Sequence, residues 1–180
     1  MIRAVLLDVG ETLVERISDQ DIPLRDQSMT PFPDTDAALA EMRRAGYGLA
    51  AVSNTEQSDD VQLDDILTRA GLRRHFDVLV TSTSVGQRKP EPAMYLKALQ
   101  HLECRPDEAV MIGDDARVDI AGANELGMAT VLVIRPGSKG PVAGISATFV
   151  VTSLREVPAL LARLNGAEDA GAHAGIVEGA

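Results

Sequence analysis

Short apolar runs alternate along the chain with longer segments in which apolar residues recur every three or four positions. The runs are rich in β-branched residues, as is typical of strands buried on both faces, and they span residues 2–7, 47–52, 78–80, 109–112, 130–134 and 148–151. The periodic segments predict helices over residues 36–45, 61–70, 92–102, 120–125 and 154–164. Glycines close to three of these helix ends fit helix caps, namely Gly46, Gly71 and Gly127.

Strands that alternate with helices predict an α/β fold. Right-handed crossovers between successive strands give a mostly parallel sheet with helices on both faces, and therefore three layers. Ligands of such folds bind at the carboxyl ends of the strands. Candidate catalytic and binding residues are therefore expected directly after the apolar runs.

The length of the chain predicts one domain. Its 180 residues, 45% of them hydrophobic, suffice for one core and are too few for two ordinary enzyme domains. We assign residues 1–165 to this core. Residues 15–33 lack periodicity and predict a polar loop, and residues 166–180, which are small, acidic and glycine-rich, predict a disordered tail.

Charge and cysteine content narrow the partners and the setting. The formal net charge of −10 repels nucleic acid and anionic membranes unless a local basic patch overrides it. Cys104 is the single cysteine and cannot form an internal disulfide, which predicts a reduced, cytoplasmic setting. No apolar run approaches the roughly 20 residues that span a bilayer, so we expect neither a secretion signal nor a membrane anchor.

Two polar groups follow the first two predicted strands. Asp8 closes the first strand, where its carboxylate can act as a covalent nucleophile, although an Asp that caps the strand–loop junction is the alternative. Ser53 and Asn54 follow the second strand, where a hydroxyl and free backbone amides can hold a phosphoryl oxygen. Alone, Ser53 would also fit a helix N-cap.

Lys89 lies in a segment whose backbone is restrained by Pro90 and Pro92. An ammonium fixed there can neutralise carboxylate and phosphoryl charge, although an isolated lysine is usually a solvated surface group.

Three carboxylates crowd the end of the fourth predicted strand: Asp114, Asp115 and Asp119. Like charges at this density are unfavourable without a cation, and a few hard oxygen ligands favour Mg²⁺ over a closed zinc site. Acids that complement a helix dipole would explain one or two of the three.

Taken in order, residues 6–13, 52–55, 86–92 and 110–119 resemble the four motifs of the haloacid dehalogenase superfamily. The resemblance extends through nearly the whole chain to residue 164. It implies a Rossmann-like core, a phosphorylated substrate, and hydrolysis through an aspartyl intermediate on Asp8.

By the same resemblance, Mg²⁺ would sit between Asp8, the backbone carbonyl of Gly10 and Asp114. Asp119 would bind or orient the metal shell, with Asp115 as a further contributor. Ser53 would contact the transferring group, and Lys89 would offset the charge of the nucleophile and the phosphoryl group.

The sequence departs from the family's phosphatases at Gly10, where these usually carry a second aspartate that serves as general acid and base. Losing such a group typically costs about 10²–10⁴-fold in rate. Glu11 could substitute for it, or the substrate could have a good leaving group, as an acyl phosphate does. Family members that hydrolyse carbon–halogen bonds also lack this aspartate.

Two other functions therefore stand beside the Mg²⁺-dependent phosphatase. A 2-haloacid dehalogenase would need no divalent cation, which the three acidic residues argue against. A catalytically weak phosphate-binding or scaffold module would not require the nucleophile, hydroxyl, lysine and acidic residues together.

The cap domain of the family is reduced here to residues 15–33 at most, so we expect an open site. Such a site either admits a bulky substrate or is roofed by a neighbouring subunit. Arg88 and Arg117 lie near its predicted mouth and could hold a second anionic group, with surface solvation as the alternative.

Overall fold

A six-stranded sheet forms the centre of the computed structural model, which describes residues 1–15, 29–56, 58–136, 138 and 140–172. The strand order is β5-β4-β1-β6-β7-β8, and every neighbouring pair is parallel. The strands are β1 (Ala4–Leu7), β4 (Gly48–Ser53), β5 (Val78–Thr81), β6 (Ala109–Gly113), β7 (Ala129–Val133) and β8 (Phe149–Val151). The predicted parallel α/β fold is confirmed.

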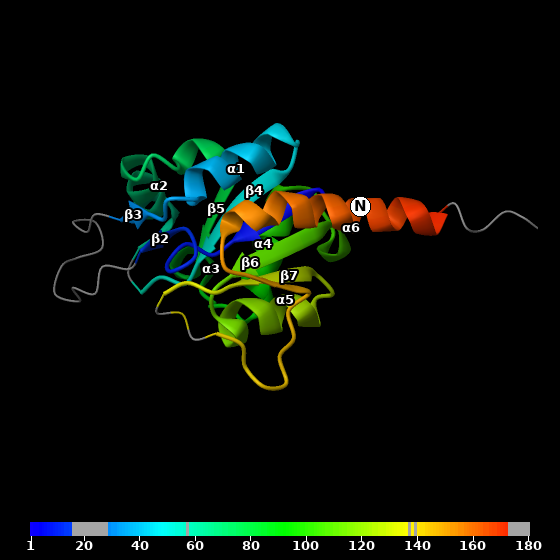
Figure 1. The fold of residues 1–180 in the computed structure, drawn as a ribbon. Coiled ribbons are helices and arrows are strands. Elements are labelled where there is room, and N and C mark those ends of the chain that lie inside the picture. The colour runs from blue at the N-terminus through cyan, green and yellow to red at the C-terminus, as the bar shows by residue number, and fades with distance from the viewer. Residues whose placement is uncertain (16–28, 57, 137, 139, 173–180) are drawn as a thin grey trace, which may run out of the picture.

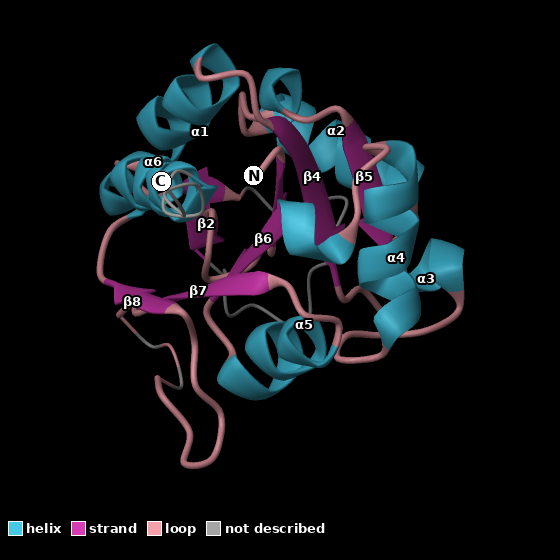
Figure 2. Cartoon of the chain, turned by 90° about the vertical axis from the view of Figure 1, so that its right-hand side faces the viewer, coloured by secondary structure: helices cyan, strands magenta, loops and turns pink. Residues whose placement is uncertain are grey.

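Helices cover both faces of this sheet (Figures 1 and 2). One layer contains α1 (Thr35–Arg44), α2 (Asp60–Arg69) and α6 (Val157–Ala172); the other contains α4 (Pro92–His101) and α5 (Ala121–Glu125). A short helix α3 (Ser82–Val85) follows β5, and 3-10 turns lie at Arg73–His75, Pro106–Glu108 and Leu154–Glu156. A single π-helical turn, Ala116–Ile120, leads from the end of β6 into α5.

Alternating side chains of the strands build a core on each face. Val5 and Leu7 of β1 pack against α1, α2 and α6, whereas Ala4 and Leu6 pack against α4 and α5. All four are completely buried. Burial on both faces explains why the strands appear in the sequence as continuous apolar runs rather than as alternating patterns.

Helix termini follow the sequence signals. Gly46 and Gly71 end α1 and α2 with φ angles of +89° and +73°, a left-handed conformation that glycine adopts without strain. At its other end, α2 begins with a capping box in which Asp59 accepts from the Gln62 amide.

Two segments differ from the prediction. A two-stranded antiparallel ribbon of β2 (Val14–Glu15) and β3 (Thr30–Pro31) lies where residues 15–33 predicted a polar loop, because strands of two residues are too short to show periodicity. Residues 16–28, most of the predicted cap segment, lie outside the described residues, so the minimal cap stays a prediction. Helix α6 continues through Ala172, past residue 166 where a disordered tail was predicted. This extension contains three alanines, the strongest helix formers, and residues 173–180 lie outside the described part.

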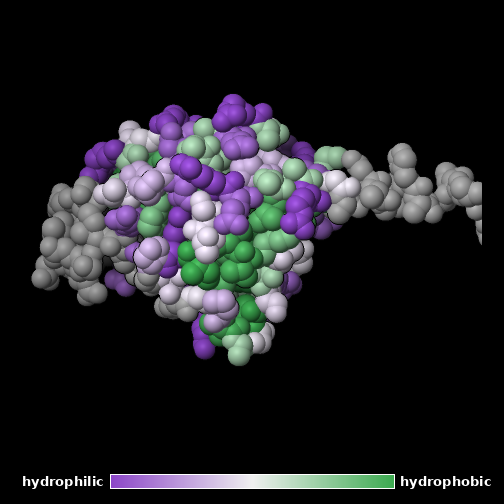
Figure 3. Space-filling model, viewed as in Figure 1, coloured by the Kyte–Doolittle hydropathy of each residue, from purple (hydrophilic) through white to green (hydrophobic). Residues whose placement is uncertain are grey.

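The surface is mixed. Polar residues dominate the upper part of the face in Figure 3, and an apolar area lies below it. Val150 of the edge strand β8 is among the exposed large hydrophobic residues, at 54% exposure. No helix in the described part of the chain has the length and apolar character needed to cross a membrane.

Candidate active site

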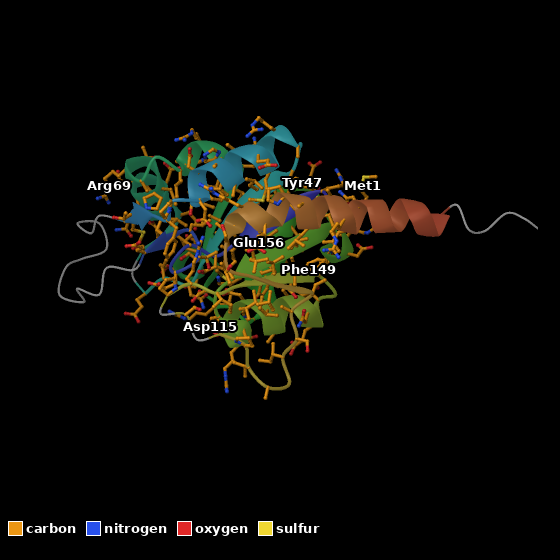
Figure 4. The ribbon with its side chains drawn as sticks, in the orientation of Figure 1. Met1, Tyr47, Arg69, Asp115, Phe149 and Glu156 are labelled. Atoms are coloured by element: carbon orange, nitrogen blue, oxygen red, sulfur yellow. The ribbon has the colours of Figure 1, made fainter. Side chains whose placement is uncertain are left out.

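Three of the predicted site residues lie at the carboxyl ends of three adjacent strands. Asp8 follows β1, Ser53 ends β4, and Asp114 follows β6, and β4 and β6 flank β1 in the sheet. In Figure 4 the label of Asp115 marks this end of the sheet, and Met1 lies on the opposite side of the molecule. Segments separated by many residues therefore contribute to one site because parallel strands present their ends at the same edge.

Lys89 joins two carboxylates at this edge. Its ammonium nitrogen lies 2.7 Å from Asp8 Oδ1 and 2.7 Å from Asp119 Oδ1. It also donates to the Val52 carbonyl at 2.7 Å. Burial alone would lower the pKa of Lys89, but the charges of Asp119 and Asp8 outweigh it and raise that pKa above its ordinary value. The lysine therefore stays charged although its side chain is completely buried.

Asp8 is held at both oxygens. Lys89 binds Oδ1, and the buried hydroxyl of Thr12 donates to Oδ2 at 3.2 Å. The Asp8 amide donates to the Ile112 carbonyl at 2.9 Å, which continues the pairing of β1 with β6 past the strand end. The Asp8 side chain remains 13% exposed, so its carboxylate is oriented and still accessible from outside.

Asp8, Asp114 and Asp119 form a cluster in which one carboxylate oxygen of each lies within 4.8 Å of the others. Burial, followed by the charges of Asp8, Asp119 and Asp115, raises the pKa of Asp114 to about 7. Burial and the charge of Asp8 also raise the pKa of Asp119, despite the nearby Lys89. Lys89 neutralises only part of this charge. The oxygen donors and the remaining negative charge fit a hard divalent cation.

The Asp119 carboxylate reaches the cluster because it lies directly against the backbone of Gly113, which has no side chain. A Cβ atom at Gly113 would lie 2.2 Å from Asp119 Oδ2, so no side chain fits there unless Asp119 moves. The π-helical turn that carries Asp119 is held by Tyr95, whose hydroxyl donates to the Val118 carbonyl at 2.7 Å. π-Helical turns occur often at functional sites.

Asp115, the further contributor that the resemblance implied, lies beside the cluster as the cap of the π-helical turn. Its side chain accepts from the amides of Arg117 and Val118 and so caps the π-helical turn, and it is not in the cluster of three carboxylates. Its backbone amide donates to Asp119 Oδ2 at 3.1 Å. It therefore helps to place Asp119, and its charge contributes to the raised pKa of Asp114.

Asn54 holds the backbone of Lys89. Its side-chain oxygen accepts from the Lys89 amide at 2.8 Å, and its side-chain nitrogen donates to the Lys89 carbonyl at 2.9 Å. The sequence predicts that Asn54 contacts substrate; in the structure its amide group positions the Lys89 backbone. Arg88 is exposed, as expected at a site mouth, and donates to the Thr55 carbonyl at 3.1 Å.

Gly10 and Glu11 lie in the tight turn after Asp8. Glu11 has a φ of +58° and donates its amide to the Val14 carbonyl, and its side chain is half-buried. It is not a member of the three-carboxylate cluster. Gly10 forms an isolated bridge with Val14, which closes the turn.

Sequence reasoning missed several residues that shape the site: Thr12, Tyr95, Gly113 and Gly122. Gly122 lets α5 approach the Lys89 segment, because a Cβ atom there would lie 2.1 Å from the Pro90 carbonyl oxygen. The available signals were a glycine directly after the predicted strand 109–112 and one inside the predicted helix 120–125, since a glycine at such a position often marks a close approach. The buried hydroxyls carried no such signal.

The family model described as haloacid dehalogenase-like hydrolase matches residues 8–133, a range that contains Asp8, Lys89, Asp114 and Asp119. The chain belongs to this family. Its six-stranded parallel sheet fits this family.

Known relatives include a phosphoglycolate phosphatase of Cupriavidus necator, which is 39% identical over 132 residues, 72% of this chain and 55% of that protein. The chain spans about half the length of the first curated relatives it matches. Among solved structures, a HAD phosphatase from Thermococcus onnurineus superposes with a TM-score of 0.76 at 24% identity, over 89% of this chain and 98% of that one. The L-2-haloacid dehalogenase from Xanthobacter autotrophicus gives 0.74 at 18% identity, over 90% and 99%. Both chemistries therefore occur on this fold, and the fold alone does not choose between them.

Proposed function

We propose that the chain is a Mg²⁺-dependent phosphatase that hydrolyses a phosphomonoester or an acyl phosphate through an aspartyl-phosphate on Asp8. The observation that carries this proposal is the arrangement around Asp8, whose carboxylate lies 2.7 Å from a buried ammonium and within 4.8 Å of two further carboxylates. The relatives support it, since the curated proteins that match this chain include a phosphoglycolate phosphatase and a phosphoserine phosphatase.

The reaction would proceed in two displacements. An oxygen of Asp8 attacks phosphorus, the bond between phosphorus and the leaving-group oxygen breaks, and the leaving group takes up a proton. Water then attacks phosphorus, loses a proton, and the bond between phosphorus and Asp8 breaks. Inorganic phosphate leaves, and the Asp8 carboxylate is regenerated.

Several residues would stabilise the negative charge that builds up on Asp8 and the phosphoryl group. Lys89 offsets the negative charge that Asp8 and the phosphoryl group bring together, and Ser53 donates to a phosphoryl oxygen. Mg²⁺ would be held by Asp8, the Gly10 carbonyl, Asp114 and Asp119, and it would supply charge neutralisation for the phosphoryl oxygens. Burial and then the charges of Asp8, Asp119 and Asp115 raise the pKa of Asp114, and a bound cation would offset both causes, which supports this assignment.

Proton transfer to the leaving group is the step that Gly10 leaves unassigned. Glu11 lies in the same turn and is the nearest acidic residue in sequence, and its left-handed backbone sets the direction of its side chain. An acyl phosphate would need little protonation because its leaving group is a weak base. We therefore propose that Glu11 donates the proton when the substrate is a phosphomonoester. Acyl phosphates are the substrates that we expect to depend least on Glu11.

The acidic cluster favours a phosphatase over a 2-haloacid dehalogenase, because halide displacement from carbon needs no divalent cation and gives no reason for three carboxylates of which Lys89 compensates only part of the charge. Retention of an accessible Asp8 beside Lys89 argues against a scaffold module. Arg88 is exposed near the mouth and would suit a second anionic group of the substrate. A subunit that roofs the open site, and a cytoplasmic location, stay predictions.

A screen of phosphorylated metabolites, with acetyl phosphate and p-nitrophenyl phosphate included, tests this proposal. We expect Mg²⁺-dependent phosphate release by the unaltered protein and none by Asp8→Asn. Glu11→Gln should slow p-nitrophenyl phosphate far less than an alkyl phosphate. Halide release from a 2-halo acid, or turnover that survives in Asp8→Asn, would contradict the proposed function.

A further inference from the structure

A buried ion pair joins two segments that flank the loop after Asp8. Arg135, which follows β7, donates from Nη1 and Nη2 to the two carboxylate oxygens of Asp34 at 3.0 and 2.9 Å. Both side chains are at most 10% exposed. The guanidinium also lies 4.2 Å from the centre of the Phe32 ring, a cation–π contact that fixes its plane.

The Asp34 carboxylate accepts hydrogen bonds from several neighbours besides Arg135. It also accepts from the Ser153 hydroxyl at 2.7 Å and from the Leu154 amide at 2.8 Å. Burial alone would raise the pKa of Asp34, but the hydrogen bonds from Arg135, Ser153 and Leu154 lower it below its ordinary value. The carboxylate thus connects the start of α1, the end of β7 and the turn that leads into α6, and it stays charged.

Arg135 has a further contact that the ion pair does not require. Its Nη2 donates to the backbone carbonyl of Thr12 at 3.1 Å, across 123 residues of sequence. The next carbonyl, that of Leu13, accepts from the Thr35 hydroxyl at 2.7 Å. Two consecutive carbonyls of the loop are therefore held by buried side chains. Thr12, the residue whose carbonyl Arg135 holds, also contacts the nucleophile, because its hydroxyl lies 3.2 Å from Asp8 Oδ2.

We infer that Arg135 is a positioning residue for the nucleophile, because by holding the Thr12 carbonyl it keeps the Thr12 hydroxyl on Asp8 and thereby fixes the carboxylate opposite Lys89. The inference rests on the proposed function and adds a residue to it. Stability alone does not explain the pair, since replacing a buried ion pair by apolar residues is often neutral or stabilising. A planar fork is required because one guanidinium has to reach both Asp34 and a carbonyl, which a lysine ammonium cannot do in the same geometry.

The test is a double-mutant cycle with Arg135→Lys and Thr12→Val. Arg135→Lys keeps a cation beside Asp34 and gives up the planar fork, so we expect kcat to fall by about 10–100-fold, the scale of a small misplacement of reacting groups, with KM changed less than about twofold. In the Thr12→Val background, the same change should alter kcat by less than about twofold, because the hydroxyl through which Arg135 acts is already gone. Independent, multiplicative effects on kcat would overturn the inference.

Arg43→Lys is the matched control. Arg43 also joins an aspartate and a backbone carbonyl, at 2.5 Å to Asp77 Oδ2 and 3.4 Å to the Tyr47 oxygen, but it lies at the opposite end of the sheet. We expect it to leave kcat and KM unchanged. An equal loss of kcat in Arg43→Lys would show a general effect of such pairs and would also overturn the inference.

Amide hydrogen exchange separates this inference from the proposed function. Arg135→Lys should speed exchange of the Leu13 and Val14 amides, which donate to the Val9 carbonyl, by about tenfold or more, while exchange in β1 and β6 stays unchanged. If the unaltered protein hydrolyses no phosphorylated compound, the proposed function fails, and this measurement still decides whether Arg135 holds the loop. Unchanged exchange at Leu13 and Val14 would overturn it.

Discussion

Lys89 stands between Asp8 and Asp119, with its ammonium nitrogen 2.7 Å from one oxygen of each. The three residues come from the ends of β1, the segment before α4 and the π-helical turn after β6, so one buried cation links three parts of the sheet edge. The same contact orients the proposed nucleophile and compensates two of the three clustered carboxylates. Its removal should therefore affect both activity and folding.

Lys89→Met should lower kcat by about 10²–10³-fold, as the loss of one fixed charge at a reacting group does elsewhere. It should also lower the free energy of unfolding by about 3–5 kcal/mol, because Asp119 would be left buried without its partner. Phosphate release and urea unfolding measure the two effects. Lys97→Met, on the exposed side of α4, is the control and should change neither. A variant of Lys89 with full turnover would contradict the assigned role.

Gly113→Ala should weaken Mg²⁺ binding by at least about tenfold, because the new Cβ would lie 2.2 Å from Asp119 Oδ2 and push this carboxylate out of the cluster. Overpacking of this kind typically costs about 1–3 kcal/mol of stability. Titration calorimetry with Mg²⁺ measures the affinity. Gly166→Ala, where a Cβ meets nothing within 4 Å, is the control and should leave Mg²⁺ affinity unchanged and stabilise α6 slightly. Equal Mg²⁺ affinity in Gly113→Ala would place the cation elsewhere.

Asn54→Ala should remove two hydrogen bonds to the backbone of Lys89, lowering stability by about 1–3 kcal/mol and kcat by about tenfold through a misplaced ammonium. Asn124→Ala offers a close match. The Asn124 side chain also uses both polar atoms, donating to the Ser146 carbonyl and accepting from Thr130, but away from the site. We expect that variant to lose stability without loss of kcat. If both variants lose kcat in proportion to stability, Asn54 has no positioning role.

The pKa of Asp114, raised to about 7 from an ordinary value of 3.8, predicts a pH dependence of stability. Between pH 4 and 7 this carboxyl group binds more protons in the folded protein than in the unfolded chain, so without metal its contribution should make the free energy of unfolding fall as pH rises and level off above about pH 7. Mg²⁺ competes with this proton, so its stabilising effect should grow over the same interval, to about 2.7 kcal/mol at 100 times its Kd.

Thermal unfolding from pH 5 to 8, with and without Mg²⁺, measures both effects. Asp114→Asn should flatten the pH dependence, although not completely, because burial and the charge of Asp8 also raise the pKa of Asp119. It should also abolish most of the stabilisation by Mg²⁺. A pH slope and a Mg²⁺ effect that are identical in Asp114→Asn would contradict the assignment of Asp114.

Most of the fold could be predicted from the sequence. Buried parallel strands require continuous apolar runs, and all six predicted runs overlap a strand of the sheet. The short ribbon β2–β3 and the extension of α6 through Ala172 could not be predicted, since the first has too few residues for a pattern and the sequence of the second, small and acidic, shows no apolar periodicity.

Asp8 and Asp114 could be predicted because local order alone sets which residue follows a strand, and parallel pairing then brings those strand ends to one edge. Lys89 was indicated by the prolines that restrain its segment. The contacts that aim these groups were decided only by tertiary structure. Arg135 reaches Thr12 across 123 residues, and Gly113 is required by a carboxylate six residues away that folds back on it. Such contacts depend on the side-by-side placement of distant segments, and no local pattern of apolar and polar residues encodes their distances.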